Sequence, residues 1–192
     1  MAHLSAPALD YRERKQALLN GWRHTALSTR GVHGALRQLA ELTDDTLRAL
    51  WRQAGLGAGC ALLAVGGYGR AELFPHSDVD VLLLLPPGAD PAADAPLRER
   101  IEAFIGHCWD TGLEIGASVR TVPECLRVAA GDITVQTALL EARRITGSAA
   151  LFGEFERCFA QHLDPLAFFT AKRLEMRQRH LKYEDTPYAL EP

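Results

Sequence analysis

The sequence is poor in cysteine and has no long apolar run, and both absences narrow the class of protein. Its four cysteines are scattered over 192 residues, without a CxxC pair or the cysteine and histidine spacing of a metal site. They are expected to be small buried apolar groups in a reducing compartment. No apolar run approaches the roughly 20 residues of a membrane span, and residues 1–15 lack the apolar core of a signal peptide. These absences predict a cytoplasmic protein with no membrane partner.

The sequence also lacks a basic excess. A formal net charge of -3 argues against a protein that coats nucleic acid, so no nucleic-acid partner is expected, although a local basic pocket is compatible with it. Hydrophobic residues make up 47% of the chain, which is enough for a core. The length of 192 residues fits one domain, with or without a helical appendage.

The first half of the sequence predicts a helical segment followed by two buried strands. Apolar residues keep helical spacing over 10–51. Apolar runs at 60–65 and 79–85, without strict polar alternation, are typical of strands that are covered on both faces. An N-terminal helical segment, 1–56, is therefore expected to precede the sheet.

The second half predicts a crossover helix, a third strand and further helices. The crossover helix begins near Asp94, a possible N-cap, and ends at Gly112. The third strand is expected at 113–122. Further helices are expected near Glu124 and at 133–144, 149–162 and 165–182, the last with Asp164 as its N-cap.

These elements predict an α/β (α+β) fold in which helices flank a short mixed sheet. The expected division is the N-terminal helical segment, a core at 57–146, and a C-terminal helical segment at 147–192. Because their surroundings are helical, Trp22, Trp51 and Trp109 are expected to belong to the core.

Two aspartates, Asp78 and Asp80, stand where the second apolar run begins. In a strand, residues two apart lie on the same side and about 6.6 Å apart. Both carboxylates therefore point toward one region, while Val79 and Val81 point into apolar packing. Such carboxylates repel one another unless a cation lies between them. Oxygen ligands of this kind suit Mg²⁺, which also binds phosphate oxygens, so the pair predicts a magnesium site at an accessible end of the sheet.

Two glycines, Gly66 and Gly67, end the preceding apolar run. Without side chains they let the backbone approach a ligand, and residues 68–73 can begin a helix whose N–H groups face an anion. Arg70 adds a guanidinium suited to phosphate. A nucleoside triphosphate held between this turn and the metal would be attacked at its α-phosphorus, with release of pyrophosphate.

Each half of this pattern also has an ordinary structural explanation. A Gly-Gly pair is usually only a turn, and an Asp-x-Asp usually lies in a loop or at a solvated strand end. The ordered combination is more specific: a strand, the glycine pair, a short spacer, Ser77, and an Asp-Val-Asp that opens a second strand. Ser77 itself either contacts the γ-phosphate or bonds within its own turn.

The stretch GGYGRAELFPHSDVD, residues 66–80, resembles the nucleotidyltransferase signature of the DNA polymerase β-like superfamily. It is most similar to the N-terminal domain of the bacterial bifunctional uridylyltransferase/uridylyl-removing enzymes of nitrogen control. Three further stretches agree with that family: LEIGASVRTVPECL, DITVQTALLEAR and RHLKYEDTPYALEP. The resemblance covers most of the chain from about residue 60 onward, and the first 55 residues carry little of it.

The resemblance implies a specific activity, the transfer of UMP from UTP to a tyrosine of the small trimeric PII signal protein, with Mg²⁺ or Mn²⁺ as the cofactor. It maps the metal aspartates onto Asp78 and Asp80, and the nucleotide-binding glycines onto Gly66 and Gly67, within a nucleotidyltransferase core at 57–146. Complete members also carry an HD-type phosphohydrolase domain and two glutamine-sensing ACT domains. This sequence has no adjacent His-Asp pair, so it is expected to be part of a longer chain and to lack the uridylyl-removing activity and the glutamine switch.

The resemblance also raises the question of a third acidic residue, which the superfamily often supplies from a later strand. Glu114 is the candidate. In the related glutamine synthetase adenylyltransferases the acidic position falls two residues later, where this chain has Gly116. Residues two apart share a strand face, so Glu114 is a candidate substitute; a surface carboxylate at the strand end is the alternative.

The last predicted helix is crowded with basic residues. Most of them are expected to form a solvated face. Lys172 and Lys182 are the candidates to contact the triphosphate or the uracil, and Tyr183 is the candidate to stack on the base.

Two other functions stay open. A related nucleotidyltransferase that uses ATP, or that modifies a different protein, has the same triphosphate chemistry, and the sequence contains no recognisable uracil selector. A non-catalytic module that binds nucleotide, or that packs against further domains, is the more distant alternative.

Overall fold

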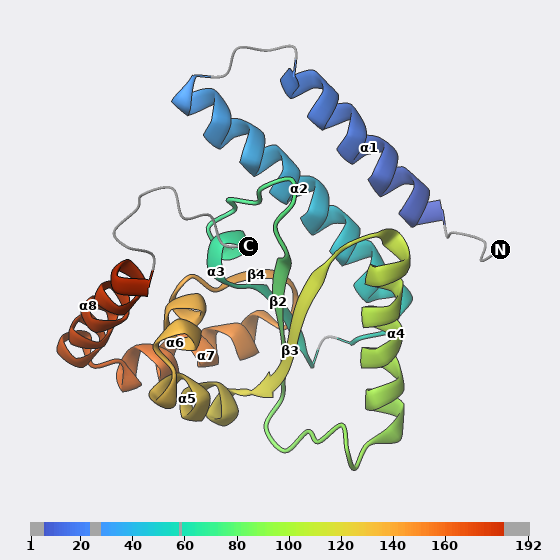
Figure 1. Ribbon diagram of the computed structural model, residues 1–192. Helices are drawn as coiled ribbons and strands as arrows, with labels where there is room; N and C mark the ends of the chain where they lie inside the picture. Colours follow the sequence, from blue (N-terminus) through green and yellow to red (C-terminus); the bar gives the residue numbers. More distant parts are fainter. Residues whose placement is uncertain (1–5, 24–27, 58, 183–192) are drawn as a thin grey trace.

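The computed structural model describes residues 6–23, 28–57 and 59–182, which fold around a mixed β-sheet with helices on both of its faces (Figure 1). In this part of the chain the sheet has four strands, in the order β3-β2-β1-β4. Their bounds are β1 Ala61–Ala64, β2 Val79–Leu85, β3 Ile115–Thr121 and β4 Arg143–Gly147. The predicted α/β architecture, a short mixed sheet flanked by helices, is confirmed.

The central strands of the sheet are β1 and β2. β1 pairs antiparallel with both β2 and β4. β2 pairs parallel with β3, and this register sets Asp80 opposite Gly116. Parallel strands need a crossover connection, which the helix α4 (Ala95–Thr111) supplies.

The other helices precede and follow this crossover. None of the described helices is both long enough and apolar enough to cross a membrane. Their bounds are α1 Ala6–Arg23, α2 Thr29–Gln53, α3 Gly66–Gly69, α5 Val122–Gly131, α6 Ile133–Leu140, α7 Ala149–His162 and α8 Pro165–Lys182.

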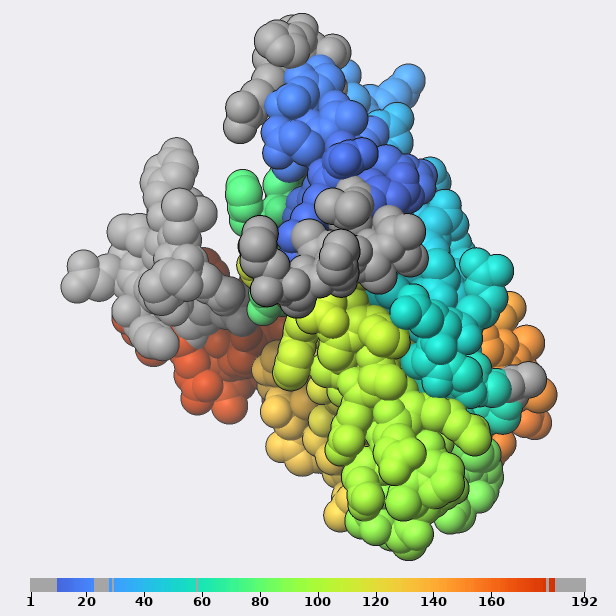
Figure 2. All heavy atoms as spheres, turned by 90° about the vertical axis from the view of Figure 1, so that its right-hand side faces the viewer, coloured from blue at the N-terminus to red at the C-terminus, as the bar shows by residue number. Residues whose placement is uncertain are grey.

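One face of the sheet packs against α1, α2 and α4. Leu62 of β1 and Leu83 of β2 are fully buried there, among the leucines of α2 and Phe104 of α4. The ring of Trp51 on α2 meets the Phe104 ring edge-on, with 5.7 Å between the centroids. From this side, the three helices make up much of the surface of the molecule (Figure 2). The N-terminal helices therefore share a hydrophobic core with the sheet.

The opposite face packs against α5, α6 and α7. Leu63 of β1 and Leu82 and Leu84 of β2 are buried in this second core, together with Phe155 of α7. Successive residues of β1 and β2 thus enter opposite cores. Both faces of these strands are apolar for that reason, and the sequence shows no polar alternation.

The predicted ends of two helices are confirmed by their hydrogen bonds. The Asp94 carboxylate accepts from the backbone N–H of Leu97 at 3.0 Å and caps α4. Gly112 ends that helix in the left-handed conformation, with φ of 86°. Asp164 caps α8 in the same way as Asp94, since its carboxylate accepts from the N–H of Leu166 at 2.9 Å.

The predicted helix at 133–144 is wrong at its C-terminal end. α6 ends at Leu140, and Arg143–Gly147 form β4, with Arg143 opposite Ala64 of β1. A β-branched Ile-Thr pair inside β4 favours a strand. The strand that it pairs with lies far away in the sequence, so local apolar spacing could not reveal the pairing.

The predicted core position is confirmed for Trp51, which is 3% exposed, and is wrong for Trp109, which is 64% exposed. Trp22 is partly buried and packs against the same core as Trp51. α4 buries the face that carries Phe104 and Cys108. Trp109 follows Cys108, and one residue turns a helix by about 100°, so the indole lies off the buried face.

We expect Phe104→Ala to destabilise the fold by about 3–5 kcal/mol, because it removes a fully buried ring and leaves a cavity between α4 and α2. Trp109→Ala, on the same helix, is the control and is expected to change the free energy of unfolding by at most about 0.5 kcal/mol. Urea unfolding followed by circular dichroism measures both values. Equal losses in the two variants would contradict this packing.

Candidate functional site

Asp78 and Asp80 stand at the start of β2. Both side chains are exposed, whereas Val79 and Val81 are buried in the core. The buried positions anchor the strand and leave the two acidic groups on its other face. The backbone N–H of Val65 donates to the carbonyl oxygen of Asp80 at 3.1 Å. The aspartate pair therefore lies directly beside the end of β1, where the glycine bend begins.

Two glycines from neighbouring segments lie near the Asp80 carboxylate. Gly66 has φ of 59°, a left-handed conformation that residues with side chains rarely adopt, and a Cβ there would lie 3.7 Å from Oδ2 of Asp80. Gly116 lies opposite Asp80 in β3, and a Cβ there would lie 2.5 Å from Oδ1. A side chain at position 116 would thus displace this carboxylate.

The electrostatics of the pair favour a bound cation. Although the Asp80 side chain is exposed, surrounding protein atoms partly desolvate its carboxylate and raise its pKa, and the negative charge of Asp78 raises it further. A divalent cation beside both carboxylates would offset the desolvation and the repulsion together. The donor set, two carboxylates at an accessible strand end, fits Mg²⁺ or Mn²⁺.

Within the described ranges, no cluster of three or more His, Cys, Asp or Glu side chains is arranged to hold a metal ion. A cation at Asp78 and Asp80 would therefore take its other ligands from water or from a bound phosphate, as Mg²⁺ commonly does. Glu114 immediately precedes β3, and its backbone oxygen accepts from Val79 N–H at 2.8 Å. It lines a cavity of about 110 Å³ together with Ser77. Its role as a third carboxylate stays a prediction.

The glycine bend folds into the short helix α3, which begins at Gly66. Arg70 follows this helix, and its guanidinium forms ion pairs with Glu72 and Glu141 through Nε and Nη1. The third nitrogen, Nη2, faces Gly67 and lies 3.6 Å from the place that a Cβ would take there. The ion pairs thus orient the guanidinium beside the bend. Phosphate binding by Arg70 and by the two glycines stays a prediction.

The other residues predicted to contact the nucleotide are Ser77, Lys172, Lys182 and Tyr183. The Ser77 hydroxyl donates to the backbone oxygen three residues before it, at 3.1 Å, which is the local bond that the sequence left open. Lys172 lies on α8 and forms an ion pair with Glu175 at 2.7 Å. Lys182 ends α8; its side chain and Tyr183 lie outside the described residues. Contacts of these residues with a nucleotide stay predictions.

Sequence reasoning missed a buried ion pair behind the bend. Asp44 on α2 is 5% exposed; it pairs with Arg143 of β4 and accepts a hydrogen bond from Tyr68 of α3. A signal was present, because Asp44 follows Ala40 by four residues and precedes Leu47 by three, on the apolar face of α2. An acidic residue in such a stripe needs a partner. The partner is not recognisable from the sequence, because the position of Arg143 depends on the pairing of β4 with β1.

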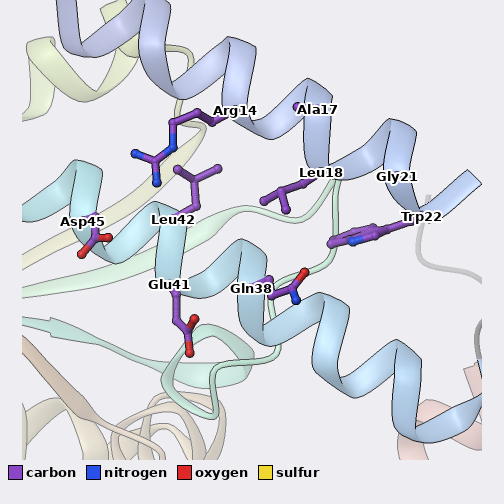
Figure 3. A pocket seen from close by; sticks show the side chains of 9 residues that line it. All are labelled: Arg14, Ala17, Leu18, Gly21, Trp22, Gln38, Glu41, Leu42 and Asp45. Atoms are coloured by element: carbon purple, nitrogen blue, oxygen red, sulfur yellow. The ribbon is translucent and has the colours of Figure 1, made fainter.

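A groove of about 650 Å³ lies between α1 and α2 (Figure 3). Its apolar side chains include Leu18 and Trp22 of α1 and Leu42 of α2, and its charged ones include Arg14 and Glu41. None of the predicted site residues lines it. The groove is therefore separate from the aspartate pair.

Fold and site together define the chain as a mixed α/β domain that presents two acidic side chains beside a glycine bend. No family model matches it. The chain is 55% identical over 183 residues to the bifunctional uridylyltransferase/uridylyl-removing enzyme of Burkholderia orbicola (strain AU 1054), a match that covers 95% of this chain and 20% of that protein. It is 59% identical over 161 residues to the enzyme of the same name from Ralstonia nicotianae, which covers 84% of this chain and 18% of that protein.

These similarities confirm the family resemblance that the stretch at residues 66–80 indicated. The chain spans about a fifth of the length of these curated relatives. Among solved structures, a crystal structure of a toxin-antitoxin with AMP-PNP matches 74% of this chain and 96% of its own, with a TM-score of 0.37 and 13% identity.

We expect Gly116→Ala to weaken Mn²⁺ binding by about tenfold or more, because the added methyl group displaces an oxygen of Asp80 and about 1.4 kcal/mol suffices for a factor of ten. Since only the end of a side chain must move, the fold should lose little stability. Gly106→Ala on α4, where a Cβ has open space, is the control. Electron paramagnetic resonance of free Mn²⁺ measures the affinity. Unchanged binding in Gly116→Ala would contradict the proposed ligand position of Asp80.

We expect Asp80→Asn to raise the melting temperature of the metal-free chain at pH 7, and to do so less at pH 4. Because the folded-state pKa of Asp80 is raised, its ionisation destabilises the fold as the pH rises above the unfolded value of about 3.9. This loss of stability is absent at pH values below the unfolded-state pKa and complete at pH values above the folded-state pKa. Thermal unfolding at both pH values checks this, with exposed Glu102→Gln as the control. A lower melting temperature for Asp80→Asn at pH 7 would exclude the electrostatic penalty.

Proposed function

We propose that the chain is a metal-dependent nucleotidyltransferase domain that transfers UMP from UTP to a tyrosine of the PII signal protein and releases pyrophosphate. The names of relatives that are 55% and 59% identical to it, uridylyltransferase/uridylyl-removing enzymes, support the uridylyl donor. The motif around Asp78 and Asp80 supports the same reaction class. PII as the acceptor follows from the family resemblance.

The observation that carries the proposal is the position of the Asp80 carboxylate. It lies between Gly66 and Gly116, beside the exposed Asp78, at the point where the backbone of β1 turns into the bend. Two carboxylates that repel one another, next to a bend that begins with two glycines, suit the binding of a metal ion and a polyphosphate better than a structural role.

Asp78 and Asp80 would hold the Mg²⁺ or Mn²⁺. When bound, such an ion offsets the negative charge of the triphosphate and of the departing pyrophosphate. Gly66 and Gly67 would admit the phosphates close to the backbone. Arg70, held by Glu72 and Glu141, would point its Nη2 toward them.

The proposed reaction is a single displacement. The phenol oxygen of the acceptor tyrosine forms a bond to the α-phosphorus of UTP, and the bond from that phosphorus to the bridging oxygen of the β-phosphate breaks. Pyrophosphate leaves, and the phenol proton passes to water or to a carboxylate of the site, for which Asp80 or a neighbouring carboxylate is the candidate. No nucleophile of the domain itself is required.

We expect Asp80→Ala to reduce pyrophosphate release from UTP, in the presence of PII and Mg²⁺, by at least about 100-fold, because it removes a metal ligand and several kcal/mol of transition-state stabilisation. Glu102→Ala, which removes an exposed carboxylate from α4, is the matched control and should keep wild-type activity. A coupled pyrophosphate assay measures the rates.

Three outcomes would contradict parts of the proposal. Release that is equally fast with ATP would point to a transferase with another donor, and release without modification of PII would point to another acceptor. Absence of metal-dependent release in the wild type would favour a non-catalytic nucleotide-binding module.

A further inference from the structure

A charged network behind the glycine bend joins three separate parts of the chain. The Asp44 carboxylate on α2 accepts two hydrogen bonds from Arg143 of β4, at 2.6 Å from Nη1 and 3.1 Å from Nη2. It also accepts one from the Tyr68 hydroxyl at 2.6 Å. Arg48, one turn further along α2, approaches the same carboxylate at 3.3 Å and donates to the backbone oxygen of Ile145 at 3.1 Å. α2, α3 and β4 are thus held by one carboxylate.

This network is largely buried. The side chain of Asp44 is 7% exposed and that of Arg143 is 32% exposed. Burial raises the pKa of Tyr68 well above its ordinary value, and the charge of Asp44 raises it further, so the hydroxyl stays protonated and donates. The Arg143 guanidinium also stacks near the Tyr68 ring, 5.6 Å from its centroid. Charge-assisted bidentate bonds of this kind are strong and directional.

Arg143 extends the network to the backbone of the bend. Its Nε donates to the carbonyl oxygen of Gly69 at 3.3 Å, and Nη2 approaches that of Tyr68 at 3.4 Å. These carbonyls lie at the C-terminal end of α3; that of Tyr68 also accepts from the backbone N–H of Ala71 at 3.0 Å. A side chain at Gly69 would meet the backbone oxygen of Glu141. The bend is therefore packed directly against the connection to β4.

The bend has little intrinsic stability. α3 has four residues, and a single helical turn is unfavourable in isolation because it fixes several dihedrals for one hydrogen bond. Ala71, just after it, has φ of 59°, which costs an L-residue roughly 1–2 kcal/mol. Such a conformation persists only where the surroundings over-determine it.

The bend in turn contacts the aspartate pair. A Cβ at Gly66, its first residue, would lie 3.7 Å from Oδ2 of Asp80, and Val65 just before it is hydrogen-bonded to the backbone of Asp80. A shift of α3 would therefore move the backbone that lines the proposed phosphate site, beside one of the proposed metal ligands.

We propose that Asp44, Arg143 and Tyr68 are positioning residues, which hold the glycine bend in the conformation that binds the triphosphate. The inference rests on the proposed function. It assigns to the N-terminal helix α2, which lies outside the recognised motif, a role in nucleotide affinity. The three residues touch neither substrate nor metal; they act through the backbone of α3.

We expect Asp44→Asn to weaken binding of UTP with Mg²⁺ by about tenfold, because a neutral amide cannot hold the guanidinium that braces the bend. Arg143→Lys, which keeps the charge but not the planar fork, should have a similar effect, and Tyr68→Phe a smaller one. Asp45→Asn is the matched control, since Asp45 is the exposed neighbour of Asp44 and forms its ion pair with Arg48. Isothermal titration calorimetry measures the affinities.

Hydrogen–deuterium exchange of the ligand-free chain gives a second readout that does not depend on UTP. Amides of residues 66–70 should exchange about tenfold faster in Asp44→Asn and Arg143→Lys, while those of β2 stay protected. In the double variant, Asp44→Asn with Arg143→Lys, these amides should exchange no faster than in either single variant, because the effects of residues that act as one unit are not additive. Asp45→Asn should leave both readouts unchanged.

The outcomes separate the two proposals. If wild-type chain does not bind UTP with Mg²⁺, the proposed function fails, while the exchange rates still show whether the network holds the bend. If exchange at residues 66–70 is unchanged in Asp44→Asn, the network does not brace the bend and the inference is overturned. Faster exchange with unchanged UTP affinity overturns the positioning role. Faster exchange in β2 as well would show a general loss of the fold. Tyr68→Phe, which keeps the ion pair, then takes the place of Asp44→Asn in the test, and unchanged exchange at residues 66–70 in that variant would overturn the inference.

Discussion

Burial of alternate residues along β2 holds two negative charges together. Val79 and Val81 are buried in the core between the sheet and the N-terminal helices, so Asp78 and Asp80 lie on the opposite side, which is accessible at this end of the strand. Desolvation and, to a smaller extent, repulsion by Asp78 raise the pKa of Asp80. This arrangement persists because a slip of one residue would bury both carboxylates and expose both valines. The surroundings are adapted to this carboxylate, since Gly116 leaves it the room that a side chain would take.

The site depends on parts of the chain that are distant in sequence. β2 and the bend between β1 and β2 supply the acidic groups and the backbone, and β3 supplies the glycine opposite Asp80. β4 supplies Arg143, and α2 supplies the Asp44 that pairs with it. The N-terminal helices are therefore part of the same packed unit as the sheet, with a shared hydrophobic core and a shared buried charge pair.

Local physical rules explain the predictions that succeeded. Asp94, Gly112 and Asp164 mark helix ends because capping is a matter of a few neighbouring residues. The strands at 60–65 and 79–85 were recognisable because they are buried on both faces. The two wrong predictions have a common cause in long-range packing. β4 is a strand because it forms backbone hydrogen bonds with β1, and Trp109 is exposed because it lies outside the face of α4 that packs against the core.

The sequence by itself determined the placement of Asp78 and Asp80, because the period of a strand sets them on the side opposite the buried Val79 and Val81. It also determined the family resemblance. Only the tertiary structure decided that Gly116 faces the Asp80 carboxylate, and that Asp44 and Arg143 pair behind the bend. These contacts join residues from different strands and helices, and a pairing of that kind depends on register and packing across the whole sheet, which no local pattern encodes.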